Sequence, residues 1–288
     1  MKSLCIKTNN INILKYLLNE LYNCNINDIC FSYCKFKIYH NIIIHYAGND
    51  TNYFLNKISD LLSILVIDEY EEKIFNNLLA QNYFYFDKNE KNKVTNIYYD
   101  NISNDFYNVF NTKQKLIKPS FYNYLKTSKS IVLDGFINFR LKDYKNYLDD
   151  LLHESVSCYI VQKEYLEFIS LVKSYVYSQK SISETIHLVY SSSESILLDE
   201  NKEILLNLDT TLKSKFLSDI SFSSNDYTLN SLLTLLPRNL YIHLIDDNID
   251  EFITTLQLIF ENKITICTNC NICSLYKQLE IKNLQSNT

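Results

Sequence analysis

Three of the eight cysteines in this chain stand within seven residues, in the stretch ICTNCNIC at residues 266–273. Cys267, Cys270 and Cys273 form a C-x2-C-x2-C pattern. Thiolates are the groups that bind Zn²⁺ and iron–sulfur clusters, whereas free thiols also pack as small apolar side chains. The pattern therefore predicts either a metal or redox site, or three sulfurs packed at the end of a sheet.

The position of the three cysteines in their predicted elements suits a reactive thiolate. Cys267 stands where the strand predicted for KITIC ends, and the other two stand in the turn that enters a helix. Unpaired amide N–H groups and the helix dipole lower the pKa of a thiol at such a turn. The residues alone leave the cofactor open between zinc, an iron–sulfur cluster and no metal.

A closed tetrahedral site needs a fourth ligand. His243 is one candidate, because its segment NLYIHLID reads as a strand that we expect to pair with KITIC. Cys5, Cys30 and Cys34 of the N-terminal strands are further candidates, and none of the four has a diagnostic spacing. With three cysteines alone, a cluster would keep one open iron position.

The other cysteines are interpreted as core residues. Their spacing is irregular, and a cytosolic protein keeps its thiols reduced, so no disulfide framework is expected. These residues are Cys5, Cys24, Cys30, Cys34 and Cys158.

Asp149, His153 and Ser157 share one helix face at i, i+4 and i+8 and imitate an acid, base and nucleophile. Side chains stacked along one helix seldom converge on a substrate, so a solvated polar stripe is the favoured interpretation. Arg140 lies in FRLKDY, and we expect it to be at least half buried against a helix end or a carboxylate rather than to bind a phosphate or an acidic partner.

A polar group of Asn225, Asp226 and Ser231 precedes Pro237. Asp226 as the N-cap of a helix over YTLNSLLTLL explains this group without chemistry.

Hydrophobic periodicity predicts an α+β fold. The N-terminal α/β region, residues 1–126, begins strand, helix, strand, strand and helix, and residues 82–126 can be assigned only loosely. The central region, residues 127–180, shows apolar residues at helical spacing from Ile131 onward, and we expect two or three helices with breaks near Gly135 and Cys158. The C-terminal α/β region, residues 181–288, reads as a hairpin across SSSE followed by a βαβ unit that ends at the cysteines.

Composition excludes several classes of protein. The chain has only two glycines, so it can hold no glycine-rich phosphate loop or dinucleotide fingerprint. The net charge is -5 and basic residues are scattered, which makes nucleic-acid binding unlikely unless folding gathers Arg140, Lys142, Lys145 and Lys163. No segment has the length of a membrane span and the first residues do not form a signal peptide, so a cytoplasmic protein is expected.

The stretch DGFINFRLKDY at residues 134–144 resembles the YtxC family of sporulation proteins of endospore-forming bacteria. The resemblance continues through VQKEYLEFISLVKSYV, LLDENKEI and SNDYTLNSLLTLLPRNLYIHL, and closes with FENKITICTNCNIC. It implies a role in sporulation, and it carries no reaction, cofactor or catalytic residue with it.

Two functions follow from these observations. The first is a non-enzymatic cytosolic protein that acts in endospore formation through contacts with an unidentified protein partner. The alternative is a thiolate metal-binding or redox module built on Cys267, Cys270 and Cys273, with zinc or an iron–sulfur cluster as the cofactor. No catalytic constellation is recognisable, so no reaction is assigned.

Overall fold

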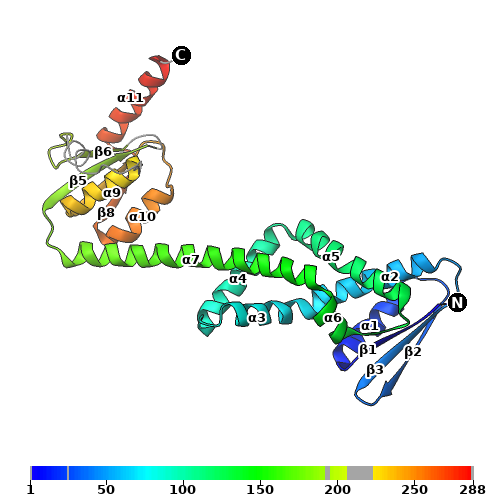
Figure 1. Cartoon of the computed structure of the whole chain (residues 1–288). Helices are drawn as coiled ribbons and strands as arrows, with labels where there is room; N and C mark the ends of the chain where they lie inside the picture. The colour runs from blue at the N-terminus through cyan, green and yellow to red at the C-terminus, as the bar shows by residue number, and fades with distance from the viewer. Residues whose placement is uncertain (1, 25, 192–194, 206–222, 287–288) are drawn as a thin grey trace, which may run out of the picture. The chain divides into compact units, whose positions relative to one another are not determined.

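The computed structural model describes residues 2–24, 26–191, 195–205 and 223–286. The chain divides into two compact units, Met1–Val161 and Gln162–Thr288. Each unit holds a four-stranded sheet and helices, which confirms the predicted α+β fold (Figure 1). The boundaries predicted at residues 126 and 180 stay a prediction, and the division between the two units falls inside the predicted central region.

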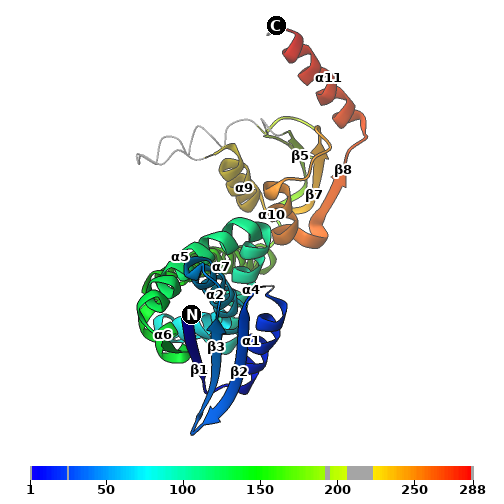
Figure 2. The same cartoon turned by 90° about the vertical axis from the view of Figure 1, so that its right-hand side faces the viewer.

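The sheet of the first unit has the strand order β2-β3-β1-β4. β1 runs antiparallel to β3 and parallel to β4. Figure 2 labels β1, β2 and β3 of this sheet. Alternate residues such as Leu4, Ile6, Ile42 and Ile44 are buried on one face, because successive side chains of a strand point to opposite faces. The strands are β1 (Lys2–Thr8), β2 (Ile29–Phe36), β3 (Tyr39–Tyr46) and β4 (Ser130–Val132).

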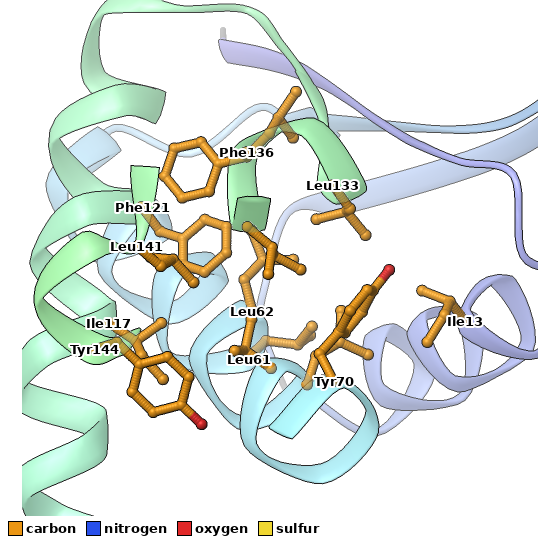
Figure 3. Packing of buried hydrophobic residues seen from close by; sticks show 14 of the residues in the cluster. Ile13, Leu61, Leu62, Tyr70, Ile117, Phe121, Leu133, Phe136, Leu141 and Tyr144 are labelled. Carbon is orange, nitrogen blue, oxygen red and sulfur yellow. The ribbon is translucent and has the colours of Figure 1, made fainter. Parts of the chain in front are cut away.

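Helices supply most of the core of the first unit (Figure 3). Phe121 and Phe136 stack there with ring centroids 4.5 Å apart, which joins α5 to α6. Residues 82–126, which the sequence assigns only loosely, are almost entirely helical. The helices are α1 (Ile11–Asn23), α2 (Thr51–Leu65), the π-helical turn η1 (Val66–Tyr70), α3 (Glu71–Asn82), α4 (Lys88–Asn104), α5 (Phe106–Thr127) and α6 (Leu133–Arg140).

A buried ion pair lies among these helices. The Glu71 carboxylate accepts hydrogen bonds from Lys113 Nζ at 2.6 Å, from the Tyr98 hydroxyl at 2.9 Å and from the Tyr144 hydroxyl at 2.7 Å. Lys113 is only 3% exposed. A buried charge is tolerated when it is paired and its remaining hydrogen-bonding capacity is filled, as it is here.

The predicted helix breaks are partly wrong. α7 (Lys142–Ser178) is a single helix that continues through Cys158. It contains no glycine or proline, so nothing in its backbone ends it early. The one interruption falls at Leu141, whereas Gly135 lies inside the first turn of α6, and Ile131 belongs to β4 rather than to a helix. α7 begins in the first unit and ends in the second.

The sheet of the second unit has the order β6-β5-β7-β8. β5 and β6 are antiparallel, which confirms the predicted hairpin, although its connection at residues 192–194 lies outside the described residues. β7, α10 and β8 form the predicted βαβ unit with parallel strands. The elements are β5 (Ser183–Tyr190), β6 (Ser195–Leu198), α9 (Ser224–Leu235), β7 (Pro237–Leu244), α10 (Glu251–Phe260), the 3-10 turn η2 (Glu261–Lys263), β8 (Ile264–Cys267) and α11 (Asn271–Ser286).

The N-cap prediction for α9 is wrong by one turn. Ser223 caps this helix and accepts from the Asp226 N–H, while the Asp226 carboxylate accepts from the Ser223 N–H. Asp226 therefore completes a reciprocal capping box from inside the helix.

The two faces of the second sheet have different partners. Ile186, Leu188, Leu240 and Ile242 belong to a core that includes residues of α7, α9 and α10. The residues that alternate with them point to the opposite face, where a smaller cluster includes Ile272 at the start of α11. Among the described helices, none combines the length and the hydropathy that a membrane span requires.

Candidate metal centre in the second unit

The cysteine triplet lies on the face of the second sheet that the start of α11 covers. Cys267 is the last residue of β8, and in the strand register it is the neighbour of His243 on β7. Cys270 directly precedes α11 and Cys273 lies in its first turn, where Ser274 N–H donates to the Cys270 carbonyl at 2.9 Å. The strand end, the helix start and the strand pairing that the sequence predicts for these residues are all present.

The three cysteine sulfurs and one imidazole nitrogen of His243 lie close together. Cys273 Sγ lies 3.6 Å from Cys270 Sγ and 3.8 Å from Cys267 Sγ. His243 Nδ1 lies 3.3 Å from Cys270 Sγ and 3.5 Å from Cys273 Sγ. All four atoms lie within 4.8 Å of one another. Of the four candidates for a fourth ligand, the structure brings His243 to the triplet.

Burial separates the members of this Cys₃His cluster. Cys273 is 1% exposed and His243 is 3% exposed, whereas Cys267 and Cys270 are half-buried. The closed side of the cluster thus faces the sheet, and its half-buried thiols give the access that a metal ion needs to enter.

The environment sets different pKa values for these groups. Burial, with the charge of His187 as a second cause, lowers the pKa of His243 to about 4, so its imidazole is neutral at neutral pH and keeps a lone pair for a metal. Burial raises the pKa of Cys273 to about 11. Burial acts in the same direction on Cys270, but hydrogen bonds from the Cys273 N–H and from neighbouring thiols outweigh it and lower its pKa. Cys270 is therefore the thiol that the fold itself favours as a thiolate.

His187 contacts the ring nitrogen of His243 that does not face the cysteines. Its Nδ1 lies 3.0 Å from His243 Nε2, and its ring stacks on Tyr241 with centroids 5.2 Å apart. Histidines that bind metals usually engage their second nitrogen in this way, which fixes the ring and its tautomer. Sequence reasoning missed His187. Its strand was predicted, but the place of that strand beside β7, where Val189 pairs with His243, depends on the order of strands in the sheet.

The remaining cysteines do not join the cluster. Cys5 and Cys24 are half-buried, and the prediction of core positions is wrong for Cys30, Cys34 and Cys158, which are exposed. Cys30 and Cys34 lie on β2, which belongs to the sheet of the first unit.

The Asp149, His153 and Ser157 series forms no catalytic arrangement. Asp149 accepts from Asn82 Nδ2 at 2.7 Å, and His153 Nδ1 lies 3.0 Å from the Tyr83 hydroxyl. The Ser157 hydroxyl donates to the backbone carbonyl of His153, one turn earlier in the same helix. These contacts fit the polar stripe that was the favoured interpretation.

The expectation of an at least half-buried Arg140 is wrong. Its side chain is exposed, and its guanidinium lies over the Tyr124 ring, 5.9 Å from the centroid. Lys145, which the nucleic-acid interpretation would need on the same face, donates to the carbonyl of Asn138 at 2.8 Å.

The fold and the cluster define an α+β protein with two units and a Cys₃His group at the strand ends of the second. The chain belongs to the YtxC-like family, whose sequence model matches residues 56–265. The matched range includes His243 and stops just before Cys267. No curated protein and no solved structure matches the chain.

Proposed function

We propose that the second unit is a zinc-binding module in which His243, Cys267, Cys270 and Cys273 are the four ligands. The observation that carries this proposal is the spacing of the ligand atoms. Zn–S bonds of about 2.3 Å in a tetrahedron place two sulfurs about 3.8 Å apart. Two of the three S···S separations here are 3.6 and 3.8 Å, and all four ligand atoms lie within 4.8 Å of one another.

The same spacing favours one ion over an iron–sulfur cluster. In a cluster, ligands held by different irons stand farther apart than ligands around one ion, whereas all four ligand atoms here lie within 4.8 Å of one another. One histidine with three cysteines is also a known ligand set of structural zinc sites.

Four protein ligands fill a tetrahedral site, and a closed site stabilises a fold rather than activating a water molecule. The bound ion would join the end of β7, the end of β8 and the first turn of α11. This supports a non-enzymatic protein whose second unit depends on the metal for the docking of α11.

Family membership supports a role in endospore formation, exercised through contacts with another protein. The test of this role is disruption of the gene in its own organism, followed by a count of heat-resistant spores. Complementation with wild-type protein should restore the count, and complementation with Cys270→Ser should restore it less fully. A disruption without effect on sporulation would remove this part of the proposal and leave the zinc site untouched.

The zinc site is tested by elemental analysis and a UV–visible spectrum of untagged protein purified without oxygen. We expect one zinc per chain and no visible absorption. Co²⁺ substitution should then give the intense visible bands of a tetrahedral, thiolate-rich site. Iron with charge-transfer bands would overturn the choice of zinc, and metal-free protein in which all three thiols react freely would overturn the metal site itself.

A further inference from the structure

The first unit carries an open sheet edge. β2 is the outermost strand, and among the described strands it pairs only with β3. The Asp28 carbonyl accepts from Ala47 N–H at 2.9 Å, so the backbone groups of Asp28 and of every second residue after it face β3. Those of Ile29, Phe31, Tyr33 and Lys35 consequently face away from the sheet, ready to pair with another strand.

Large aromatic side chains are exposed along this edge. Tyr33 is 63% exposed and Phe36 64%. Tyr22 of α1 is 76% exposed and contacts Phe31 edge to face, with ring centroids 4.8 Å apart. Figures 1 and 2 show the β2–β3 hairpin projecting beyond the neighbouring helices. Long exposed apolar edges are unusual in proteins that stay monomeric.

The other edge of this sheet offers much less. β4 has only three residues, and its Ser130 carbonyl already accepts from the Tyr124 hydroxyl at 3.4 Å. Among the described strands of this sheet, the eight residues of β2 therefore offer the better place for an added strand.

We propose that β2 pairs with β2 of a second copy of this chain, antiparallel and about a two-fold axis at Ser32. This inference is independent of the zinc site. The two sheets would become one continuous sheet across the axis, and the interface would be the same patch on both copies, as two-fold symmetry requires.

Charge is the reason for choosing a second copy as the partner. Asp28 precedes β2, and Lys35 and Lys37 stand at its other end. Among the described residues none forms an ion pair with these three. Antiparallel self-pairing brings the acidic end of each strand to the basic end of the other, which a parallel partner would not do.

The register follows from the pleat and from this charge pattern. Residues that oppose each other across a strand pair point to the same face, so an even-numbered residue must oppose an even-numbered one. With the axis at Ser32, Asp28 opposes Phe36 of the second copy, next to Lys37, whose ammonium nitrogen lies 5.7 Å from the centroid of the Phe36 ring. The same register places Phe31 opposite Tyr33, and Cys30 opposite Cys34.

Cys30 and Cys34 provide a test of both the pairing and the register. Both thiols are exposed, and as a pair without mutual backbone hydrogen bonds they would have Cα atoms about 4.5 Å apart, within disulfide range. Mild oxidation by diamide, which takes up the two electrons and two protons that each thiol pair loses, should give a covalent dimer. The experiment uses Cys158→Ser protein throughout, because Cys158 is the other exposed thiol.

The single variants sharpen the result. Cys30→Ser alone and Cys34→Ser alone should give no covalent dimer, since every cross-link needs one thiol of each kind. A mixture of the two variants should regain it, because one copy then supplies Cys34 and the other Cys30. If either single variant by itself formed as much covalent dimer as the Cys158→Ser parent protein, the proposed register would be wrong.

Sedimentation equilibrium of the reduced protein tests the association without a covalent bond. We expect a dimer whose amount depends on protein concentration. Lys37→Asp should raise its dissociation constant about tenfold, because the exposed ion pair that is lost occurs twice in a symmetric dimer. The additional exchange Asp28→Lys should restore the wild-type dissociation constant. Tyr33→Pro should abolish the dimer while the unit stays folded, because the lost N–H faces away from β3. A monomer at every concentration would overturn the proposal.

Discussion

His187 Nδ1 lies 3.0 Å from His243 Nε2, and this contact leaves His243 Nδ1 as the nitrogen that faces the cysteines. If His243 Nδ1 held a metal, Nε2 of the neutral imidazole would carry the proton and would donate a hydrogen bond to His187 Nδ1. The two histidines come from adjacent parallel strands, so the sheet itself aims the ligand ring. Metal binding by the proposed site would therefore depend on a residue that does not contact the metal.

His187→Phe should therefore weaken zinc binding by about 10–100-fold, because it keeps an aromatic ring beside Tyr241 but removes the acceptor that orients His243. The measurement is competition for zinc against a chromophoric chelator. Tyr241→Phe is the matched control, since it preserves the stacked ring and changes only a hydroxyl. Wild-type affinity in His187→Phe would mean that this histidine serves packing alone.

Cys270→Ser should lower the zinc content and cost at least about 3 kcal/mol in the free energy of unfolding of the second unit, because binding to a structural site is part of the folding free energy. Urea unfolding with and without a chelator measures this cost. Cys158→Ser, at an exposed position of α7, should stay within about 0.5 kcal/mol of the wild type. If the Cys270→Ser protein had the wild-type free energy of unfolding and still bound zinc, the assignment of Cys270 as a ligand would be wrong.

The cluster could be anticipated from the sequence because its parts are local. Cys267, Cys270 and Cys273 are close in sequence. The position of His243 beside them follows from the pairing of the two strands of one βαβ unit. His187 could not be anticipated, because its role depends on the order of strands in the sheet, which periodicity does not specify.

Burial was the property that the sequence predicted least well. Cys30 and Cys34 share one face of β2 as core residues would, but they are exposed, whereas Ile29 and Phe31 on the other face pack against the core. Likewise, an ordinary helix length suggested a break in α7 near Cys158, whereas an uninterrupted run of residues that tolerate the helix continues through it.

The buried ion pair of the first unit is a further feature beyond sequence reasoning, because Glu71 and Lys113 are 42 residues apart. Glu71→Ala should cost about 3–5 kcal/mol in the free energy of unfolding, since it leaves a buried ammonium group without a counter-charge. Urea unfolding followed by tyrosine fluorescence measures this loss.

The matched control is the partly exposed pair of Lys118 and Asp60, whose side chains are each 34% exposed and whose Nζ···O distance is a similar 2.7 Å. Asp60→Ala should cost no more than about 1 kcal/mol, because solvent screens the interaction. Removing both buried charges with Glu71→Leu and Lys113→Met should restore part of the loss. Equal costs at the two sites would show that the buried pair has no special energetic role.

Alkaline pH should destabilise the first unit through the two tyrosines that donate to Glu71. Burial, followed by the charge of Glu71, raises the pKa values of Tyr98 and Tyr144 above the ordinary value. In the unfolded chain both titrate near pH 10. Their stabilising contribution is therefore complete below pH 10 and is lost as the pH rises beyond it, because the unfolded state then binds fewer protons than the folded state.

Above pH 10, each of these tyrosines makes the free energy of unfolding decrease by about 1.4 kcal/mol more per pH unit. Tyr144→Phe should make the slope shallower by that amount, and Tyr98→Phe should do the same. Tyr107→Phe is the control, because it removes the same hydroxyl from a side chain that is 77% exposed. Urea unfolding at several pH values between 9 and 11.5 gives the slopes. An unchanged slope in Tyr144→Phe would mean that its hydroxyl ionises in the folded protein as readily as in the unfolded chain, contrary to its burial against a carboxylate.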